Sequence, residues 1–112
     1  MAGCIFCMIA NGEIPSKIVY ENDLVVAFDD LHPQAPVHTL VVPKAHYQDI
    51  ADGVPAETMA AIFAAACEVA RIKGINESGF RIISNKGADA GQTVPHFHVH
   101  VLGGRKMDEG LV

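Results

Sequence analysis

Three histidines alternate with apolar residues in one short segment of this chain, residues 96–102, which reads His-Phe-His-Val-His-Val-Leu. Successive side chains of a β-strand point to opposite faces. The alternation therefore predicts a strand with three imidazoles on one face and Phe97, Val99 and Val101 on the other, toward the core. Neighbouring imidazoles would lie about 6.5–7 Å apart along the strand. A solvated strand face would normally mix Thr, Lys and Glu, which disfavours a purely solvent-exposed role for the three histidines. Imidazole can carry a proton, attack an electrophile or bind a metal, so we interpret the histidines as a functional cluster.

The length and composition indicate one globular domain over residues 1–112. Half of the residues are apolar, which suits a packed core rather than a disordered chain. The formal net charge of −5 argues against a nucleic-acid surface, which is usually basic. No apolar run approaches the ~20 residues of a membrane span, and the first residues do not resemble a signal peptide. We expect neither nucleic acid nor membrane as a partner, and a cytoplasmic location.

The remaining segments predict an α+β fold with a five-stranded antiparallel sheet, one long helix and a short N-terminal helix. Strand-like patterns occupy residues 17–21, 24–29, 38–42, 80–85 and 96–102. Helical spacing of apolar residues begins at Phe6 and stops at Gly12. Strands that precede and follow the long helix, with hairpin-like connections, favour an antiparallel arrangement.

The long helix is expected over residues 55–73. Pro55 suits its first turn and Gly74 supplies the stop. Helical spacing of apolar residues predicts one buried face, made of Met59, Ile62, Phe63, Ala66, Cys67 and Ala70. Cys67 is therefore expected to be a small buried hydrophobic residue.

A polar loop, residues 86–93, leads directly into the histidine segment. Gly87 and Gly91 permit positive φ angles and close approach of the backbone to a ligand. Gln92 and Thr93 add amide and hydroxyl donors, so the loop suits an anion such as phosphate. A neutral imidazole beside a phosphate can attack phosphorus and form a covalent intermediate. His98 has a histidine on either side and is the best candidate nucleophile.

The N-terminal Cys4-Ile5-Phe6-Cys7 has the spacing of half a structural zinc site. Two further ligands would be needed, and two reduced cysteines without a metal are the alternative. A thioredoxin-like redox role is disfavoured, because the motif does not follow a strand and open a long helix.

Residues 96–102 resemble the His-φ-His-φ-His-φ-φ signature of the histidine triad (HIT) superfamily. The chain is similar to the Hint branch of that superfamily, the purine nucleoside phosphoramidases, from about Ile5 to Arg105. Further segments carry this resemblance: Phe6, Ile9, Gly12-Glu13-Ile14-Pro15, Ala27-Phe28, Pro33-Gln34-Ala35-Pro36, His38, Leu40-Val41-Val42-Pro43-Lys44, Gly91-Gln92 and Leu102-Gly103-Gly104-Arg105. Two positions depart from it, since Pro95 replaces a frequent aromatic residue and Asp29 a frequent His or Arg.

The resemblance implies a HIT-like fold and a hydrolase that cleaves adenosine or other purine nucleoside 5′-phosphoramidates, or acyl-adenylates, with AMP or GMP as product. His98 would be the nucleophile, supported by His100 and His38, and Thr93 would contact the phosphate or the leaving group. The implied nucleotide contacts comprise an apolar purine slot (Phe6, Ile9, Ile14 and Phe28), the ribose side (Asp30 with Leu31), and the ribose-phosphate region (Asn85, Gly91, Gln92, Thr93, Val94, His98 and His100).

The resemblance also implies a homodimer and no organic cofactor. Some relatives carry the same Cys-x-x-Cys, and there the outer ligands resemble His46 and His96. Together with Cys4 and Cys7 these would form a closed Cys₂His₂ zinc site that leaves His98 free.

Two other functions compete with this interpretation. In a zinc hydrolase, His96 and His98 would hold a catalytic metal that activates water. In a nucleotide-binding or scaffold module, catalysis would be incidental.

Overall fold

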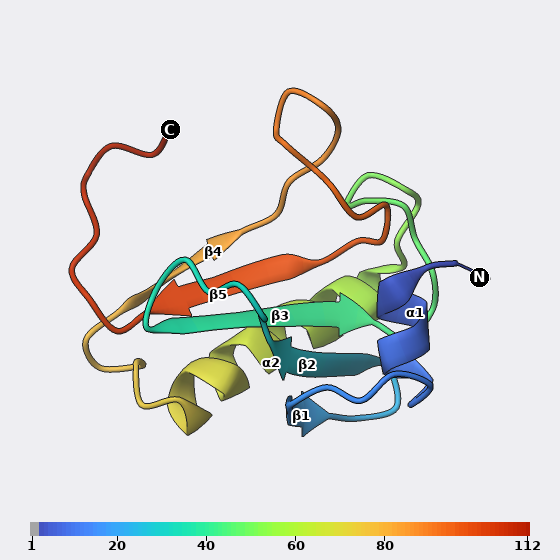
Figure 1. Cartoon of the computed structure of the whole chain (residues 1–112), viewed down its shortest axis with the longest axis horizontal. Helices are drawn as coiled ribbons and strands as arrows, with labels where there is room; N and C mark the ends of the chain where they lie inside the picture. Colours follow the sequence, from blue (N-terminus) through green and yellow to red (C-terminus); the bar gives the residue numbers. More distant parts are fainter. Residues whose placement is uncertain (1–2) are drawn as a thin grey trace.

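The structure, a computed structural model, describes residues 3–112, so the first two residues of the expected domain lie outside it. One five-stranded antiparallel sheet carries a helix on each face (Figure 1). The elements are α1 (Ile5–Ala10), β1 (Ile18–Glu21), β2 (Val25–Asp29), β3 (Val37–Pro43), α2 (Ala56–Ile72), β4 (Phe80–Ile83) and β5 (Val99–Gly103). The predicted α+β fold with a five-stranded antiparallel sheet is confirmed.

The strand order, β1-β2-β3-β5-β4, places the last strand of the chain inside the sheet. β5 lies between β3 and β4, where His100 is paired with Leu40 on one side and with Ile83 on the other. His38 of β3 is paired with Leu102. The order of the strands thus brings His38 beside the histidine segment, 62 residues away in sequence from His100.

The alternation of side chains divides the core into two layers. Val25, Val41 and Val99 point to the face covered by α2, where the larger apolar cluster lies. The alternate residues of β2 and β3 point to the other face, where Phe6 of α1 packs on them. These residues are Val26, Phe28, Leu40 and Val42. Phe97 and Val101 also belong to the α2 layer, as predicted from the sequence. The histidine side chains of the alternating segment are consequently directed to the face that carries α1.

The strand predicted over residues 96–102 is wrong at its start, because β5 begins only at Val99. Pro95 has no N–H to donate, and the N–H of Phe97 donates to the Tyr47 carbonyl at 2.6 Å instead of to a neighbouring strand. The carbonyl of Pro43, at the end of β3, lies 2.9 Å from Nε2 of the His96 ring. A side chain therefore occupies the position that a ladder amide would take. The other predicted bounds differ from the observed ones by one or two residues.

Helix α2 buries part of the predicted face, Ile62, Ala66 and Ala70, but not all of it. Its buried residues are Thr58, Ile62, Ala65, Ala66, Val69 and Ala70. Phe63 is 42% exposed and Cys67 is also exposed, so the expectation that both are core residues is wrong. The small side chains of Ala65, Ala66 and Ala70 allow the helix to approach the sheet closely. Phe63 and Cys67 are exposed, whereas Met59 is partly buried against the core.

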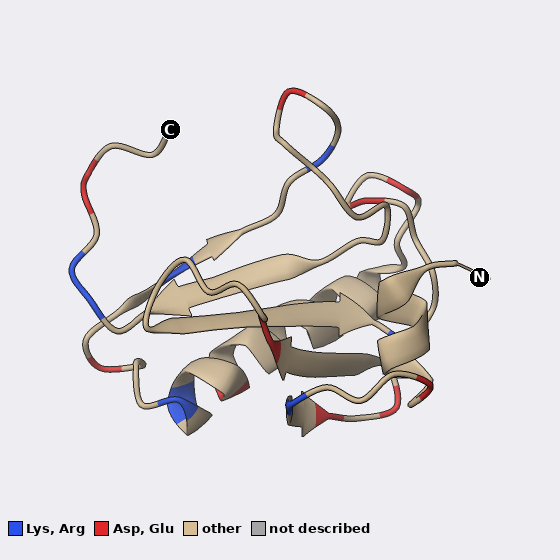
Figure 2. Ribbon diagram, in the orientation of Figure 1, with Lys and Arg blue, Asp and Glu red and all other residues tan. Residues whose placement is uncertain are grey.

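Lys and Arg are interspersed with Asp and Glu around the periphery of the molecule, while the strands are largely uncharged (Figure 2). Among residues 3–112, no helix combines the length and the apolar character needed to cross a membrane.

Candidate active site and metal centre

His98 is held by its own main chain. Its Nδ1 lies 2.7 Å from the carbonyl oxygen of His96, and a carbonyl can only accept, so Nδ1 carries the proton. The other ring nitrogen, Nε2, is then left with its lone pair. The hydroxyl of Ser84 donates to the His98 carbonyl at 2.8 Å and fixes the same segment from the other side. The side chain is buried, and this burial lowers the pKa of His98, which keeps the ring neutral at neutral pH.

His38 and His100 form a second, directed pair. The backbone N–H of Gln34 donates to Nδ1 of His38 at 2.9 Å, so the ring proton of His38 is on Nε2. That Nε2 lies 2.8 Å from Nδ1 of His100 and donates to it, which leaves the proton of His100 on its Nε2. The His100 ring is centred 5.0 Å from the His98 ring. Burial, with the neighbouring imidazoles, lowers the pKa of His100 to about 4.

Asp30 joins this pair at the end of β2. Its Oδ2 lies 3.5 Å from Nε2 of His38, and its Oδ1 accepts the N–H of His32 at 2.8 Å. The neighbouring Asp29 accepts hydrogen bonds from Thr39 and from Lys73, the C-cap residue of α2, both at 2.9 Å. Partial burial alone would raise the pKa of Asp29, but hydrogen bonds from Lys73 and Thr39 and the charges of Lys73 and Lys17 outweigh it and lower that pKa. This acidic residue, which departs from the family pattern, thus anchors the end of β2 to the helix.

An apolar cleft of about 390 Å³ lies between α1 and the sheet. Eight of the predicted nucleotide contacts line it: Phe6, Ile9, Ile14, Phe28, Asp30, Leu31, Thr93 and Val94. Leu31 is 86% exposed. The Phe6 ring packs edge-on against the His98 ring, with centroids 5.0 Å apart, so the candidate nucleophile adjoins the cleft.

Five predicted contacts do not line this cleft: His98 and His100 of the histidine segment, and Asn85, Gly91 and Gln92 of the loop between β4 and β5. The Gln92 side chain braces the loop: its oxygen accepts the N–H of Gly87 at 2.9 Å, and its amide donates to carbonyls of Gln48 and Val94. Its amide is therefore committed to the protein itself. Gly91 has a φ of +78°, the conformation for which a glycine was expected.

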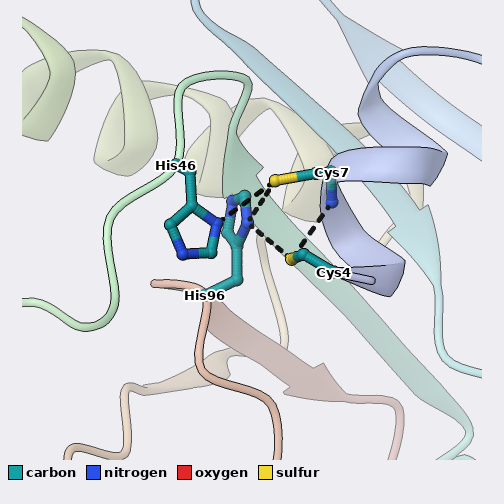
Figure 3. Close-up of side chains that lie close together, drawn as sticks. All are labelled: Cys4, Cys7, His46 and His96. Atoms are coloured by element: carbon teal, nitrogen blue, oxygen red, sulfur yellow. Dashed lines mark hydrogen bonds between the residues drawn. The ribbon is translucent and has the colours of Figure 1, made fainter. Parts of the chain in front are cut away.

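The two cysteines and two histidines predicted as metal ligands come together at the N-terminal end of α1 (Figure 3). One ligand atom from each of Cys4, Cys7, His46 and His96 lies within 4.8 Å of all the others. Nδ1 of His96 is 3.3 Å from Sγ of Cys4 and 3.4 Å from Sγ of Cys7, while Nδ1 of His46 is 3.2 Å from Sγ of Cys7.

These side chains fit a tetrahedral zinc ion. Zn–S and Zn–N bonds of about 2.3 and 2.0–2.1 Å place ligand atoms roughly 3.3–3.8 Å apart, close to the observed separations. Nε2 of His96 donates to the Pro43 carbonyl at 2.9 Å, so the lone pair is on Nδ1, the atom that faces the two sulfurs. Burial lowers the pKa of His96 to about 4, so the ring is neutral, as a ligand must be.

The same geometry disfavours a catalytic metal on His96 and His98. The Nδ1 atoms of the two rings have different partners, the cysteine sulfurs for His96 and a main-chain carbonyl for His98. Among the described residues, two groups of side chains could hold a metal, and His98 belongs to neither: Cys4, Cys7, His46 and His96, and Asp30, His38 and His100.

Sequence reasoning did not find the groups that orient the rings. Gln34 acts through its backbone N–H and Pro43 through its carbonyl, and neither carries a side-chain signal. Ser84 could have been noticed as a hydroxyl at the end of the fourth predicted strand.

Comparison with known proteins identifies the family of this chain. The HIT domain family model matches residues 11–107. Purine nucleoside phosphoramidase of Escherichia coli K12 is 43% identical over 106 residues, which cover 92% of this chain and 88% of the relative. An uncharacterised HIT-like protein of Azospirillum brasilense is 48% identical over 92% of this chain and 87% of its own.

Solved structures give the same result. A HIT family hydrolase from Clostridium thermocellum superimposes with a TM-score of 0.95 at 42% identity and covers 100% of this chain and 99% of its own. A histidine triad protein from Clostridium difficile has a TM-score of 0.92 at 48% identity, with 99% and 98% covered. Sequence, fold and the arrangement of histidines therefore place the chain in the HIT family.

Proposed function

We propose that this protein is a nucleotide-binding hydrolase that cleaves purine nucleoside 5′-phosphoramidates, or related acyl-adenylates, through a covalent nucleotidyl intermediate on His98. The observation that carries the proposal is the hydrogen bond from Nδ1 of His98 to the His96 carbonyl. It leaves Nε2 unprotonated in a neutral ring that packs against Phe6, one of the residues that line the apolar cleft. The phosphoramidase named among the relatives supports the same reaction class.

The chemistry has two displacements. In the first, Nε2 of His98 forms a bond to the α-phosphorus while the P–N bond of the substrate breaks. The amine leaves with the electron pair of that bond and takes up a proton from the solvent. In the second, water attacks the phosphorus and gives up a proton to the solvent, the electron pair of the bond to phosphorus returns to Nε2 of His98, and the nucleoside monophosphate is released. The N–H on Nε2 of His100 can donate to a phosphate oxygen, and His38 fixes that ring.

The cleft suits a purine nucleoside. Phe6 and Phe28, whose ring centroids are 5.5 Å apart, provide aromatic surface for a flat base, with Ile9 and Ile14 beside them. Asp30 lines the same cleft with a carboxylate that can accept hydrogen bonds from ribose hydroxyls. Thr93, near the end of the glycine-containing loop, is assigned to the phosphate or the leaving group.

We further propose that Cys4, Cys7, His46 and His96 bind a structural zinc ion. A closed Cys₂His₂ set has no open position for a substrate, so the ion would contribute to folding rather than to the reaction. A homodimer and a cytoplasmic location complete the proposal.

A pure binding or scaffold module is the second candidate. The cleft alone would serve it, but binding gives no reason for the directed hydrogen bonds that free Nε2 of His98 and orient His100.

Replacing His98 with Ala should lower kcat for an adenosine phosphoramidate by about three orders of magnitude or more, because the covalent step is lost. AMP affinity should change less than about tenfold, since binding is spread over the cleft. Steady-state kinetics and calorimetry measure the two effects, and a thermal melt checks that the variant is folded. In the wild type, a quenched reaction with labelled substrate should leave label on His98. A variant that retained a tenth of the wild-type kcat would contradict the assignment.

The pH dependence of kcat/KM should report the neutral nucleophile. Burial lowers the pKa of His98, so the unprotonated form persists to more acidic pH than for a free imidazole. The rate should therefore stay level as the pH falls to 6.5, the ordinary pKa of histidine, and decline only below it. Zinc content measured at each pH separates this decline from loss of the metal. An acidic limb centred above pH 6.5 would be inconsistent with a buried, neutral His98.

Protein purified without chelator should contain about one zinc ion per chain. Cys4→Ser or Cys7→Ser should reduce this content sharply and lower the melting temperature, because a structural ion stabilises the folded state. The value of kcat at saturating nucleotide should change less than the stability does. The matched control is Cys67→Ser, an exposed cysteine of α2 outside the cluster, which should keep the full zinc content. Metal-free protein with an unchanged melting temperature would refute the structural role.

Light scattering at micromolar concentration should give about twice the chain mass of 11.9 kDa. The reasons are the exposed Phe63 and Cys67 on α2 and the position of β4 at an edge of the sheet, which a two-fold partner would cover. Phe63→Asp should give monomers, whereas Ile18→Asp, a matched change of a similarly exposed residue on the opposite edge strand, should not. A fully active monomeric wild type would disprove the dimer.

A further inference from the structure

We propose that the metal site and the nucleotide cleft are thermodynamically coupled through α1, so that zinc raises the affinity for a purine nucleotide and the nucleotide raises the affinity for zinc. The inference rests on the proposed functions of the two sites and adds a regulatory link between them. No step of the reaction is assigned to the metal.

Helix α1 contributes to both sites at once. Sγ of its N-cap residue, Cys4, and Sγ of Cys7 belong to the metal cluster. Ile5, Phe6 and Ile9, from the same six residues, line the cleft. The two sites therefore share one short element rather than lying on independent parts of the fold.

The position of α1 depends on contacts with the rest of the protein. A helix of six residues is far below the roughly 12–15 residues needed for marginal stability alone. Phe6 and Cys7 are its buried residues, and the core of this layer is the smaller of the two. Without a metal, the cysteines are joined to His46 and His96 only by sulfur–nitrogen contacts of 3.2–3.4 Å, and sulfur is a weak hydrogen-bonding group.

Coordination would join three separate segments. Cys4 and Cys7 bring α1, His46 brings the loop after β3, and His96 brings the segment before β5. Phe6 lies between the cysteines in sequence, and its ring is centred 6.0 Å from the His96 ring and 5.0 Å from the His98 ring. Ligation therefore holds Phe6 in the position in which it forms the wall of the cleft.

The energetic consequence is reciprocal. In the metal-free protein, part of the nucleotide binding energy would be needed to order α1, so the apparent dissociation constant rises. By linkage, the nucleotide must change zinc affinity by the same factor as zinc changes nucleotide affinity. Couplings of this kind typically amount to about 5- to 150-fold.

The test measures binding, not turnover. Calorimetry gives the dissociation constant of AMP for the zinc-loaded and the metal-free chain, both kept reduced. Competition with a chromophoric chelator gives the zinc dissociation constant with and without saturating AMP. We expect zinc to lower the dissociation constant of AMP, and AMP to lower that of zinc, by equal factors of at least about fivefold. Should the metal-free chain unfold, AMP must still slow the transfer of zinc from the loaded protein to the chelator.

Two variants locate the link. Phe6→Ala should bring the coupling factor close to one while zinc still binds, because the shared contact is removed. Met8→Ala, a change in the same helix at a residue that does not line the cleft, should preserve it. If zinc and AMP both bind the wild type, but neither ligand changes the dissociation constant of the other by as much as twofold, the coupling is disproved and the two sites stand. If the loaded protein binds no AMP, or takes up no zinc, the proposed sites fail and the coupling with them.

Discussion

The alternation of side chains along β5 and the residues just before it is the constraint on which the rest of the structure depends. It sends Phe97, Val99 and Val101 into the layer beneath α2 and the intervening histidines to the opposite face. Alternate residues of one segment therefore specify the core and the site. An insertion of one residue would exchange the two sets and bury imidazoles against α2. The insertion of β5 between β3 and β4 then supplies His38 as a neighbour.

Much of this was accessible from the sequence, because local patterns determine the sheet and the two helices. The spacing of apolar residues predicted the elements to within one or two residues, except at the start of β5. There a proline and two tertiary hydrogen bonds, from Phe97 N–H to Tyr47 and from His96 to Pro43, replace the ladder. Such bonds depend on which segments meet in space, which a period-two pattern does not encode.

The face of α2 shows a second limit of sequence reasoning. Two overlapping stripes of apolar residues have helical spacing, and periodicity alone does not say which of them meets the sheet. The structure selects the stripe with Ala65, Ala66 and Ala70, because small residues permit close packing. Phe63, the larger residue, is left half-exposed on the flank. Likewise, its amide donors predict that Gln92 contacts the nucleotide, but in the structure the amide donates to the carbonyls of Gln48 and Val94.

The candidate site is built from neutral imidazoles, and this is its decisive physical property. A cationic cluster would attract a phosphate more strongly, but a protonated ring has no lone pair for attack. Burial and mutual proximity instead lower the pKa of His96 and of His100 to about 4. Each neutral ring has one N–H, and in His96, His98 and His38 it is committed to a fixed acceptor. The His98 tautomer thus follows from the backbone that positions it, and its Nε2 keeps a lone pair.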